Sequence, residues 1–275
     1  MSRVAYCTGH LHDQPLATVA EMARLAGYEG LDINGDGFEK SPPPHLTPRL
    51  DAHHREQARA DLRDIDKAAS ALGANVYLVP DDDRRGQENL AYAMASIDLA
   101  AELGIPLVHC FTGRQAQSLS RAEAFSRLSD ALARLCDHGA GRGVKVAVEG
   151  CVPHFIRSTA DYLELIGNLP GADLRVCFDP SHIFLHGESE FEAAEKLIDR
   201  ISIVHVKDAA GRFPDFSCPP LGAGEMDWPG LLSLLRGLGY GGQLAVEYEA
   251  DQFGWKQDRM AAMLDARRFL RDQGF

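Results

Sequence analysis

The sequence predicts an α/β protein folded as a closed (β/α)8 barrel in one domain, residues 1–275. Short apolar runs alternate with amphipathic helical patterns, the unit repeats about every thirty residues, and there are eight candidate strands. These strands are Arg3–Cys7, Gly30–Ile33, Asn75–Val79, Pro106–Phe111, Lys145–Glu149, Leu174–Asp179, Ile201–Val206 and Gln243–Glu249. An open, doubly wound sheet is the alternative, but no G-x-G-x-x-G motif follows the first strand and the count of eight favours closure.

Four stretches between the strands show the 3.6-residue periodicity of amphipathic helices. They are Leu16–Gly27, Leu62–Gly73, Leu90–Gly104 and Phe125–Gly139. Three of them end on a glycine directly before a short turn into the next strand, which is typical of a helix C-terminus.

The two longest loops follow the second and seventh strands, at Asn34–His54 and Lys207–Asp227. Loops in these positions surround the active site of a (β/α)8 barrel. Each is therefore a candidate lid, and each fits a surface excursion or an oligomer contact equally well. Within the second loop, Asp227 before Trp228 and Pro229 is expected to cap a helix.

Composition narrows the class of partner. The net charge of −12 argues against nucleic acid and anionic membranes as partners. The N-terminus lacks a signal-peptide pattern, and no apolar run approaches the ~20 residues of a membrane span. We therefore expect a cytoplasmic protein. The six cysteines are scattered without a Cys-x-x-Cys pair, which predicts reduced, buried thiols.

Four consecutive strands, the fifth to the eighth, end on side chains that can bind a metal: Glu149, Asp179, His205 and Glu247. Alternate residues of a barrel strand face its axis, so each of these shares the inward face with the residue two positions earlier. They are 30, 26 and 42 residues apart, which corresponds to successive steps around the barrel. The four side chains are therefore expected to converge at the mouth.

Three carboxylates that converge with one imidazole cannot all stay ionised without a cation, because like charges at close range repel strongly. A divalent metal resolves this conflict. Three oxygen ligands and one nitrogen favour Mn2+, Mg2+ or Co2+ over Zn2+, which prefers more nitrogen and sulfur. We expect one divalent ion, with Mn2+ as the first choice.

These motifs resemble the xylose isomerase-like barrel superfamily, and more closely the sugar phosphate isomerase/epimerase family of ketose 3-epimerases, hydroxypyruvate isomerases and inosose dehydratases. The resemblance covers essentially the whole chain and is strongest from Lys145 onward. It is carried by Glu149, "DPSH" at Asp179 to His182, "HVKD" from His205, "LGAGEMDW" at Leu221 to Trp228, and "VEYE" with Glu247.

The resemblance implies one divalent metal held by Glu149, Asp179, His205 and Glu247, with the two glutamates also acting as acid and base. It implies substrate contacts for His182 and Arg212, and an assembly of two or four identical subunits. The substrate class is a small sugar. A free ketose or keto-polyol is preferred to a phosphorylated one, because no glycine-rich phosphate cradle follows the seventh or eighth strand.

In such a site, removal of the proton beside a carbonyl gives an enediolate. Glu149 removing the proton and Glu247 returning one on the other side gives epimerisation. Return on the same side gives isomerisation, and loss of a β-hydroxyl gives dehydration. The four ligands do not choose among these outcomes.

Several other polar residues near the strand ends are candidates for contact with a polyol, and surface or supporting roles suit them equally well. His12 and His109 are the substrate-binding candidates among them. The others are His10, Asp13, Asp32 and Asn34. Lys207, next to His205, is expected to point outwards.

Two alternatives remain. A multi-zinc apurinic endonuclease would also use His109, but it needs a histidine at the end of the third strand, where Pro80 stands. It also needs an Asp-x-His after the seventh strand, and no histidine follows His205. A sugar-binding barrel without catalysis is disfavoured by the intact pair Glu149 and Glu247.

Overall fold

The computed structural model describes residues 2–38, 43–114 and 116–275 and shows a closed barrel of eight parallel strands. Around the barrel each strand pairs with the next one along the chain, and the last pairs with the first. The strands are β1 (Arg3–Cys7), β2 (Gly30–Asn34), β3 (Ala71–Gly73), β4 (Leu107–Phe111), β5 (Lys145–Glu149), β6 (Leu174–Phe178), β7 (Ile201–Val206) and β10 (Gln243–Val246). The predicted fold class is confirmed.

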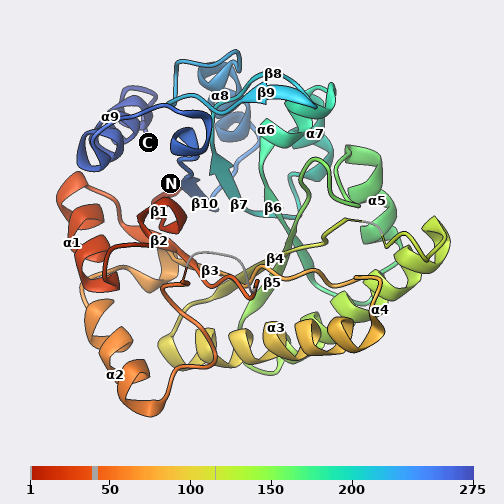
Figure 1. Cartoon of the computed structure of the whole chain (residues 1–275). Helices are drawn as coiled ribbons and strands as arrows, with labels where there is room; N and C mark the ends of the chain where they lie inside the picture. Colours follow the sequence, from red (N-terminus) through yellow and green to blue (C-terminus); the bar gives the residue numbers. More distant parts are fainter. Residues whose placement is uncertain (1, 39–42, 115) are drawn as a thin grey trace.

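Helices form a ring around this barrel (Figure 1). The α-helices are α1 (Leu16–Ala26), α2 (Ala52–Asp61), α3 (Asp83–Leu103), α4 (Arg121–Ala140), α5 (Thr159–Gly167), α6 (Pro180–His186), α7 (Glu190–Leu197), α8 (Trp228–Gly237) and α9 (Arg259–Asp272). Short 3-10 helices lie at η1 (Gly9–Leu11), η2 (Lys67–Ala69) and η3 (Ala250–Phe253). The loop after β7 contains a small hairpin, β8 (Ala210–Arg212) and β9 (Asp215–Ser217).

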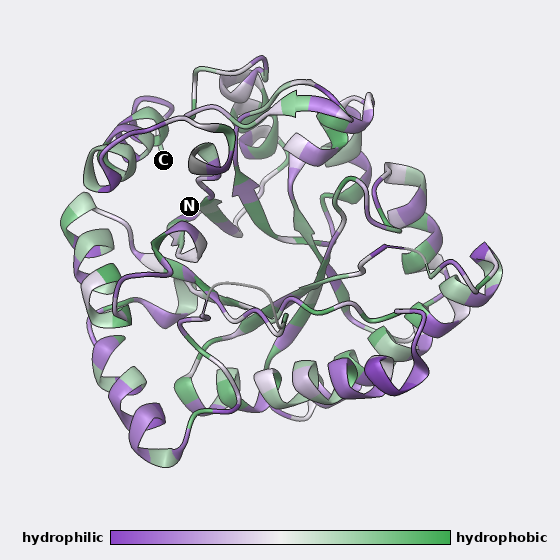
Figure 2. Cartoon of the chain, in the orientation of Figure 1, coloured by the Kyte–Doolittle hydropathy of each residue, from purple (hydrophilic) through white to green (hydrophobic). Residues whose placement is uncertain are grey.

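The core has two parts. A large apolar layer fills the space between strands and helices, whose outer faces are hydrophilic (Figure 2). The barrel interior is filled by a separate small cluster: Ala5, Cys7, Ala71, Leu107, Ala147, Cys177, Ile203 and Ala245. Ala147, Cys177, Ile203 and Ala245 each precede a candidate metal ligand by two residues, so the predicted alternation along these four strands is confirmed.

The third β/α unit differs from the prediction. The predicted strand Asn75–Val79 and the predicted helix Leu62–Gly73 are both wrong, because β3 is Ala71–Gly73 and the helix before it is α2. Strand pairing decides the outcome, since β3 lies between β2 and β4 in the barrel and its residues complete both ladders. The secondary-structure propensity of a short segment predicts its structure only weakly, and pairing with neighbouring strands can override it.

The loop after β2 is shorter than predicted, because Asp51 accepts a hydrogen bond from His54 N and caps α2. Residues 39–42 of the predicted lid lie outside the described part of the chain.

All six cysteines are buried and none forms a disulfide, as predicted. Among the described residues, no helix has the length and apolar character needed to cross a membrane.

Candidate metal centre and active site

The four predicted ligands converge at the carboxyl ends of the barrel strands. Glu149 ends β5, Asp179 follows β6, His205 lies in β7 and Glu247 follows β10. One ligand atom from each lies within 4.8 Å of the others. The first three residues are only 2% exposed, and the Glu247 side chain is 22% exposed. The structure thus brings together a set of groups with the composition of a metal site.

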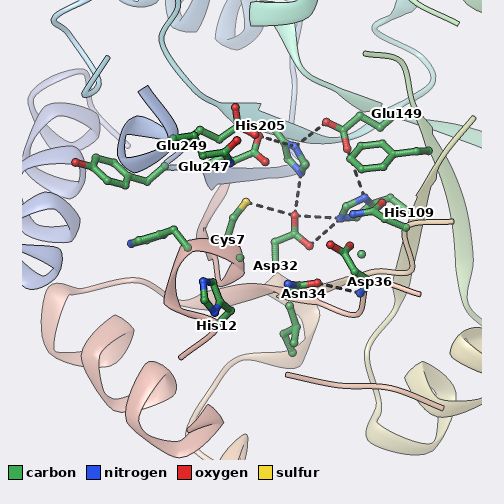
Figure 3. A pocket seen from close by; sticks show the side chains of 18 of the residues that line it. Cys7, His12, Asp32, Asn34, Asp36, His109, Glu149, His205, Glu247 and Glu249 are labelled. Carbon is green, nitrogen blue, oxygen red and sulfur yellow. Dashed lines mark hydrogen bonds and ion pairs between the residues drawn. The ribbon is translucent and has the colours of Figure 1, made fainter. Parts of the chain in front are cut away.

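Local contacts orient this set. Asp179 caps α6, since its Oδ1 accepts a hydrogen bond from Ser181 N at 2.8 Å, and this leaves Oδ2 for the site. Nδ1 of His205 lies 3.2 Å from Glu149 Oε1 and 3.4 Å from Glu247 Oε2. Glu149 and Glu247 lie on either side of His205 (Figure 3).

The donor set fits a divalent cation. Glu149 Oε2 is buried and accepts no hydrogen bond from any described residue, and a buried carboxylate oxygen without a partner is costly. Three carboxylates and one imidazole also match the oxygen-rich sites of Mn2+ and Mg2+. Glu149, Asp179, His205 and Glu247 would hold the ion.

Asp32 joins two histidines from separate strands of the barrel, His109 of β4 and His205 of β7. Its Oδ1 lies 2.8 Å from Nε2 of His109, and its Oδ2 lies 2.8 Å from Nε2 of His205. Cys7 Sγ also donates to Oδ2, at 3.4 Å. Burial acts to raise the pKa of Asp32, but the charges and hydrogen bonds of the two histidines outweigh it and hold this pKa below its ordinary value.

This arrangement orients the His205 ring. Nε2 faces Asp32, and Nδ1 faces Glu149 and Glu247, where it is placed to bind a metal once it has lost its proton. Carboxylate-oriented histidines of this kind are common next to metals in proteins. The sequence placed Asp32 at the end of its strand without indicating either histidine as its partner.

The direction of the Lys207 side chain differs from the prediction. It was predicted to point outwards, yet it is 2% exposed and its Nζ lies 2.9 Å from both Asp179 Oδ2 and Glu247 Oε2. Position 207 is two residues after His205, so the two side chains share the inward face. Lys207 is therefore a residue of the site that the sequence analysis missed, although strand alternation carried the signal.

A cavity of about 490 Å3 opens beside these groups, a size that suits a small polar molecule. His12 and His109, two of the predicted substrate contacts, line it, and so do His10, Asp32 and Asn34. The cavity is also lined by residues that the sequence analysis did not select, among them Asp36, Asn75, Tyr248, Glu249 and Arg259.

The other two predicted substrate contacts lie elsewhere. His182 Nε2 lies 3.5 Å from Asp179 Oδ2 and 3.5 Å from Lys207 Nζ, beside the candidate ligands and not among the residues that line the cavity, and its role in substrate binding stays a prediction. Arg212 lies on β8, where its guanidinium stacks 3.7 Å from the centre of the Phe184 ring and its side chain is 52% exposed. The structure does not bring Arg212 to the cavity, and its role in binding stays a prediction. Asp13, on the rim, forms an ion pair with Arg259.

The fold and the site together define a (β/α)8 barrel with an acidic, histidine-containing centre at the carboxyl ends of its strands. The Xylose isomerase-like TIM barrel family matches residues 19–273, and the chain belongs to this family. The resemblance found in the sequence is thereby confirmed at the level of the family.

Individual relatives are distant. An inosose dehydratase of Lacticaseibacillus casei is 24% identical over 270 residues, which cover 90% of this chain and 85% of that protein. The 3-keto-D-glucoside 4-epimerase YcjR of E. coli superposes with a TM-score of 0.79 at 16% identity, covering 99% of this chain and 100% of that one. The IOLI protein, crystallised with a zinc atom, gives a TM-score of 0.78 at 21% identity, covering 98% and 97%. These structures share the fold.

The third strand ends at Gly73 and not near Pro80, so the histidine that an apurinic endonuclease needs would stand close to Gly73. Residues 71–75 contain no histidine, and the endonuclease alternative stays disfavoured.

Proposed function

We propose that the chain is a divalent-metal-dependent isomerase or epimerase of a small, unphosphorylated ketose or keto-polyol. The observation that carries this proposal is the convergence of Glu149, Asp179, His205 and Glu247 beside a cavity of sugar-sized volume. The epimerase YcjR supports the class of reaction, because it has the same fold.

Glu149 and Glu247 are the proposed acid and base. Glu149 Oε2 has no hydrogen-bond partner among the residues that the structure describes, so it is free to accept a proton from the substrate carbon beside the carbonyl. Glu247 reaches the same centre from β10 and is more exposed, so it is placed to return a proton to the enediolate. A divalent ion held by the four ligands would supply the Lewis acidity that makes this carbon acidic.

Other residues of the cavity are proposed to bind hydroxyl groups. His109 Nδ1 is buried, lies 3.8 Å from Glu149 Oε2 and forms no hydrogen bond within the described part of the chain, while its Nε2 is held by Asp32. Nδ1 is therefore oriented to form a hydrogen bond with a substrate hydroxyl. His12, on the rim of the cavity, is the proposed contact for the outer end of the substrate.

Dehydration of a keto-polyol is the second candidate. It is favoured by the similarity to an inosose dehydratase, which extends over 90% of this chain. The two candidates share the first step, removal of a proton by Glu149, and differ in the second. Return of a proton gives an isomer or epimer, whereas loss of a β-hydroxyl gives an unsaturated ketone.

Proton exchange tests the shared step. Protein stripped with a chelator and reloaded with Mn2+, Mg2+, Co2+ or Zn2+ is incubated in D2O with a panel of free ketoses and keto-inositols, and deuterium at the carbon beside the carbonyl is followed by NMR. We expect exchange with at least one substrate. The product then separates the candidates, because only dehydration creates a conjugated chromophore.

Two glutamate variants control this experiment. Glu149→Gln removes the proposed base and is expected to lower exchange by about a thousandfold or more. Glu195→Gln makes the same change on the exposed face of α7 and is expected to leave exchange unaltered. Absence of exchange across the panel from protein that has bound the metal contradicts the proposed function.

A further inference from the structure

The amino group of Lys207 lies inside the proposed metal centre. Nζ is 2.9 Å from Asp179 Oδ2 and 2.9 Å from Glu247 Oε2, and these residues are two of the four that form the candidate ligand set. Lys207 directly follows β7 and is buried, and the residues that contact its amino group follow β6 and β10. An ammonium group thus contacts two carboxylates that a metal would also bind.

We propose that Lys207 is a built-in counter-ion that competes with the divalent metal for Asp179 and Glu247, and that Glu249 takes over the ammonium group when the metal binds. This inference rests on the metal centre of the proposed function. It adds a residue that sets the affinity of the centre and that keeps the metal-free protein folded.

Distances support the competition. A divalent ion bound to oxygen ligands lies about 2.1 Å from each oxygen. An ion bound by Asp179 Oδ2 and Glu247 Oε2 would therefore lie only a few ångströms from Nζ of Lys207, and the two cations would repel each other in a site with little water. Binding of the divalent ion to Asp179 and Glu247 therefore weakens the ion pairs of Lys207 with these residues, and the ion pairs in turn weaken metal binding.

The charges around Lys207 explain why a cation is needed when the metal is absent. Four carboxylates gather here, those of Glu149, Asp179, Glu247 and Glu249, whereas the carboxylate of Asp32 is committed to His109 and His205. Lys207 is the one lysine or arginine that contacts them among the described residues. Without it, several buried negative charges would face one another.

Glu249 is suited to receive the ammonium group. Its Oε2 lies 3.5 Å from Nζ, farther than the oxygens of Asp179 and Glu247 but within reach of a small shift of the lysine side chain. Glu249 does not belong to the four-residue ligand cluster, so a shift of Lys207 towards it would free both ligands and keep the ammonium group paired with a carboxylate. His182 Nε2, 3.5 Å from Nζ, faces the same group.

Calorimetric titration of chelator-stripped protein with Mn2+ tests the proposal. Lys207→Met is unbranched and only one atom shorter than lysine, and it removes the charge, so we expect it to bind Mn2+ about tenfold tighter than the wild type. In the metal-free state the same variant is expected to unfold at a lower temperature, and saturating Mn2+ is expected to reverse this loss. Lys207→Gln is a second neutral variant, and the same changes in it would show that they come from loss of the charge and not from the packing of methionine.

A double-mutant cycle tests the part played by Glu249. Glu249→Gln is expected to weaken Mn2+ binding about threefold or more in the wild type, because Lys207 then has no carboxylate to move to. In the Lys207→Met background this effect is expected to disappear. Additive effects would instead indicate simple long-range electrostatics and would overturn the transfer to Glu249.

Lys196→Met is the matched control, because it removes one lysine charge from the exposed face of α7, where Lys196 pairs with Glu192. Its Mn2+ affinity should equal that of the wild type. Equal affinities of wild type, Lys207→Met and Lys207→Gln overturn the proposal, and so does absence of Mn2+ binding in all of them. Failure of the proposed function is a different result, namely Mn2+ binding with the predicted differences but no proton exchange from any sugar.

Discussion

The carboxylate of Asp32 lies 2.8 Å from Nε2 of His205, although 173 residues separate the two in the chain. Asp32 is the middle residue of β2 and His205 lies in β7, and β1 and β10 separate these two strands in the closed barrel. The contact therefore crosses the interior of the barrel. It fixes the imidazole in the orientation that presents Nδ1 to the carboxylates of Glu149 and Glu247.

We predict that Asp32→Asn weakens Mn2+ binding by about 10- to 100-fold, the usual effect of losing a carboxylate that orients a metal-ligating histidine. The asparagine amide lacks the negative charge and has an NH2 donor in place of one carboxylate oxygen, so it holds the Nε2–H groups of His109 and His205 less strongly. Calorimetric titration gives the affinity. Asp36→Asn, the same change elsewhere in the cavity, serves as the comparison, and equal affinities of the two variants would contradict the prediction.

Binding of a divalent ion should stabilise the fold, because the ligands are brought together only in the folded chain. At a free concentration 100 times the dissociation constant, the gain is about 2.7 kcal/mol. For a domain of this size it corresponds to a rise of several degrees in Tm. Differential scanning calorimetry with Mn2+ and then with EDTA measures it. An unchanged Tm at saturating Mn2+ would exclude a metal centre of this kind.

Asp36 should make stability depend on pH. Burial raises its pKa to about 6, and a hydrogen bond with Asn75 only partly offsets this. The folded state then holds a proton that the unfolded state releases, so stability falls as pH rises from about 4 to about 6. Asp36→Asn removes the ionisable group and therefore the cost of ionising it inside the folded protein. We expect this variant to raise the free energy of unfolding by about 1–2 kcal/mol at pH 8 and to have little effect below pH 4.

Urea denaturation of wild type and variant over this pH range is the measurement. A gain that is equally large at pH 3.5 and pH 8 would show that titration of Asp36 is not its cause.

The centre of the site was predictable because it depends on a short-range rule. Side chains alternate along a strand, so the position of His205 within its strand determines which way it points, and the same rule applied to Glu149, Asp179 and Glu247. Applied consistently, it also predicts the inward direction of Lys207. That residue was missed through an error in applying the rule, and not because the sequence lacked the signal.

The remaining features depend on contacts that a single sequence does not encode locally. Asp32 gains its importance from His109 and His205, which lie 77 and 173 residues away. The third strand was misplaced because Ala71–Gly73 has only three residues and lies within a stretch of helical periodicity. Its pairing with β2 and β4 exists only once the barrel closes.

Asp208 organises the loop between β7 and α8. Its carboxylate accepts hydrogen bonds from the backbone N–H groups of Gly222, Gly224 and Met226, at 2.8, 3.1 and 3.4 Å, and from its neighbour Ala209 at 2.9 Å. Because Asp208 directly follows Lys207, the loop and the site share this segment of backbone.

We predict that Asp208→Ala lowers the free energy of unfolding by about 2–4 kcal/mol, since several backbone donors lose their acceptor at once. Asp227→Ala is the comparison within the same loop. As predicted from the sequence, Asp227 caps a helix, α8, and it accepts one hydrogen bond, from Gly230 N at 3.0 Å. Its loss should cost only about 1 kcal/mol. Urea denaturation of both variants compares the two costs, and an effect of Asp208→Ala no larger than that of Asp227→Ala would show that Asp208 does not organise the loop.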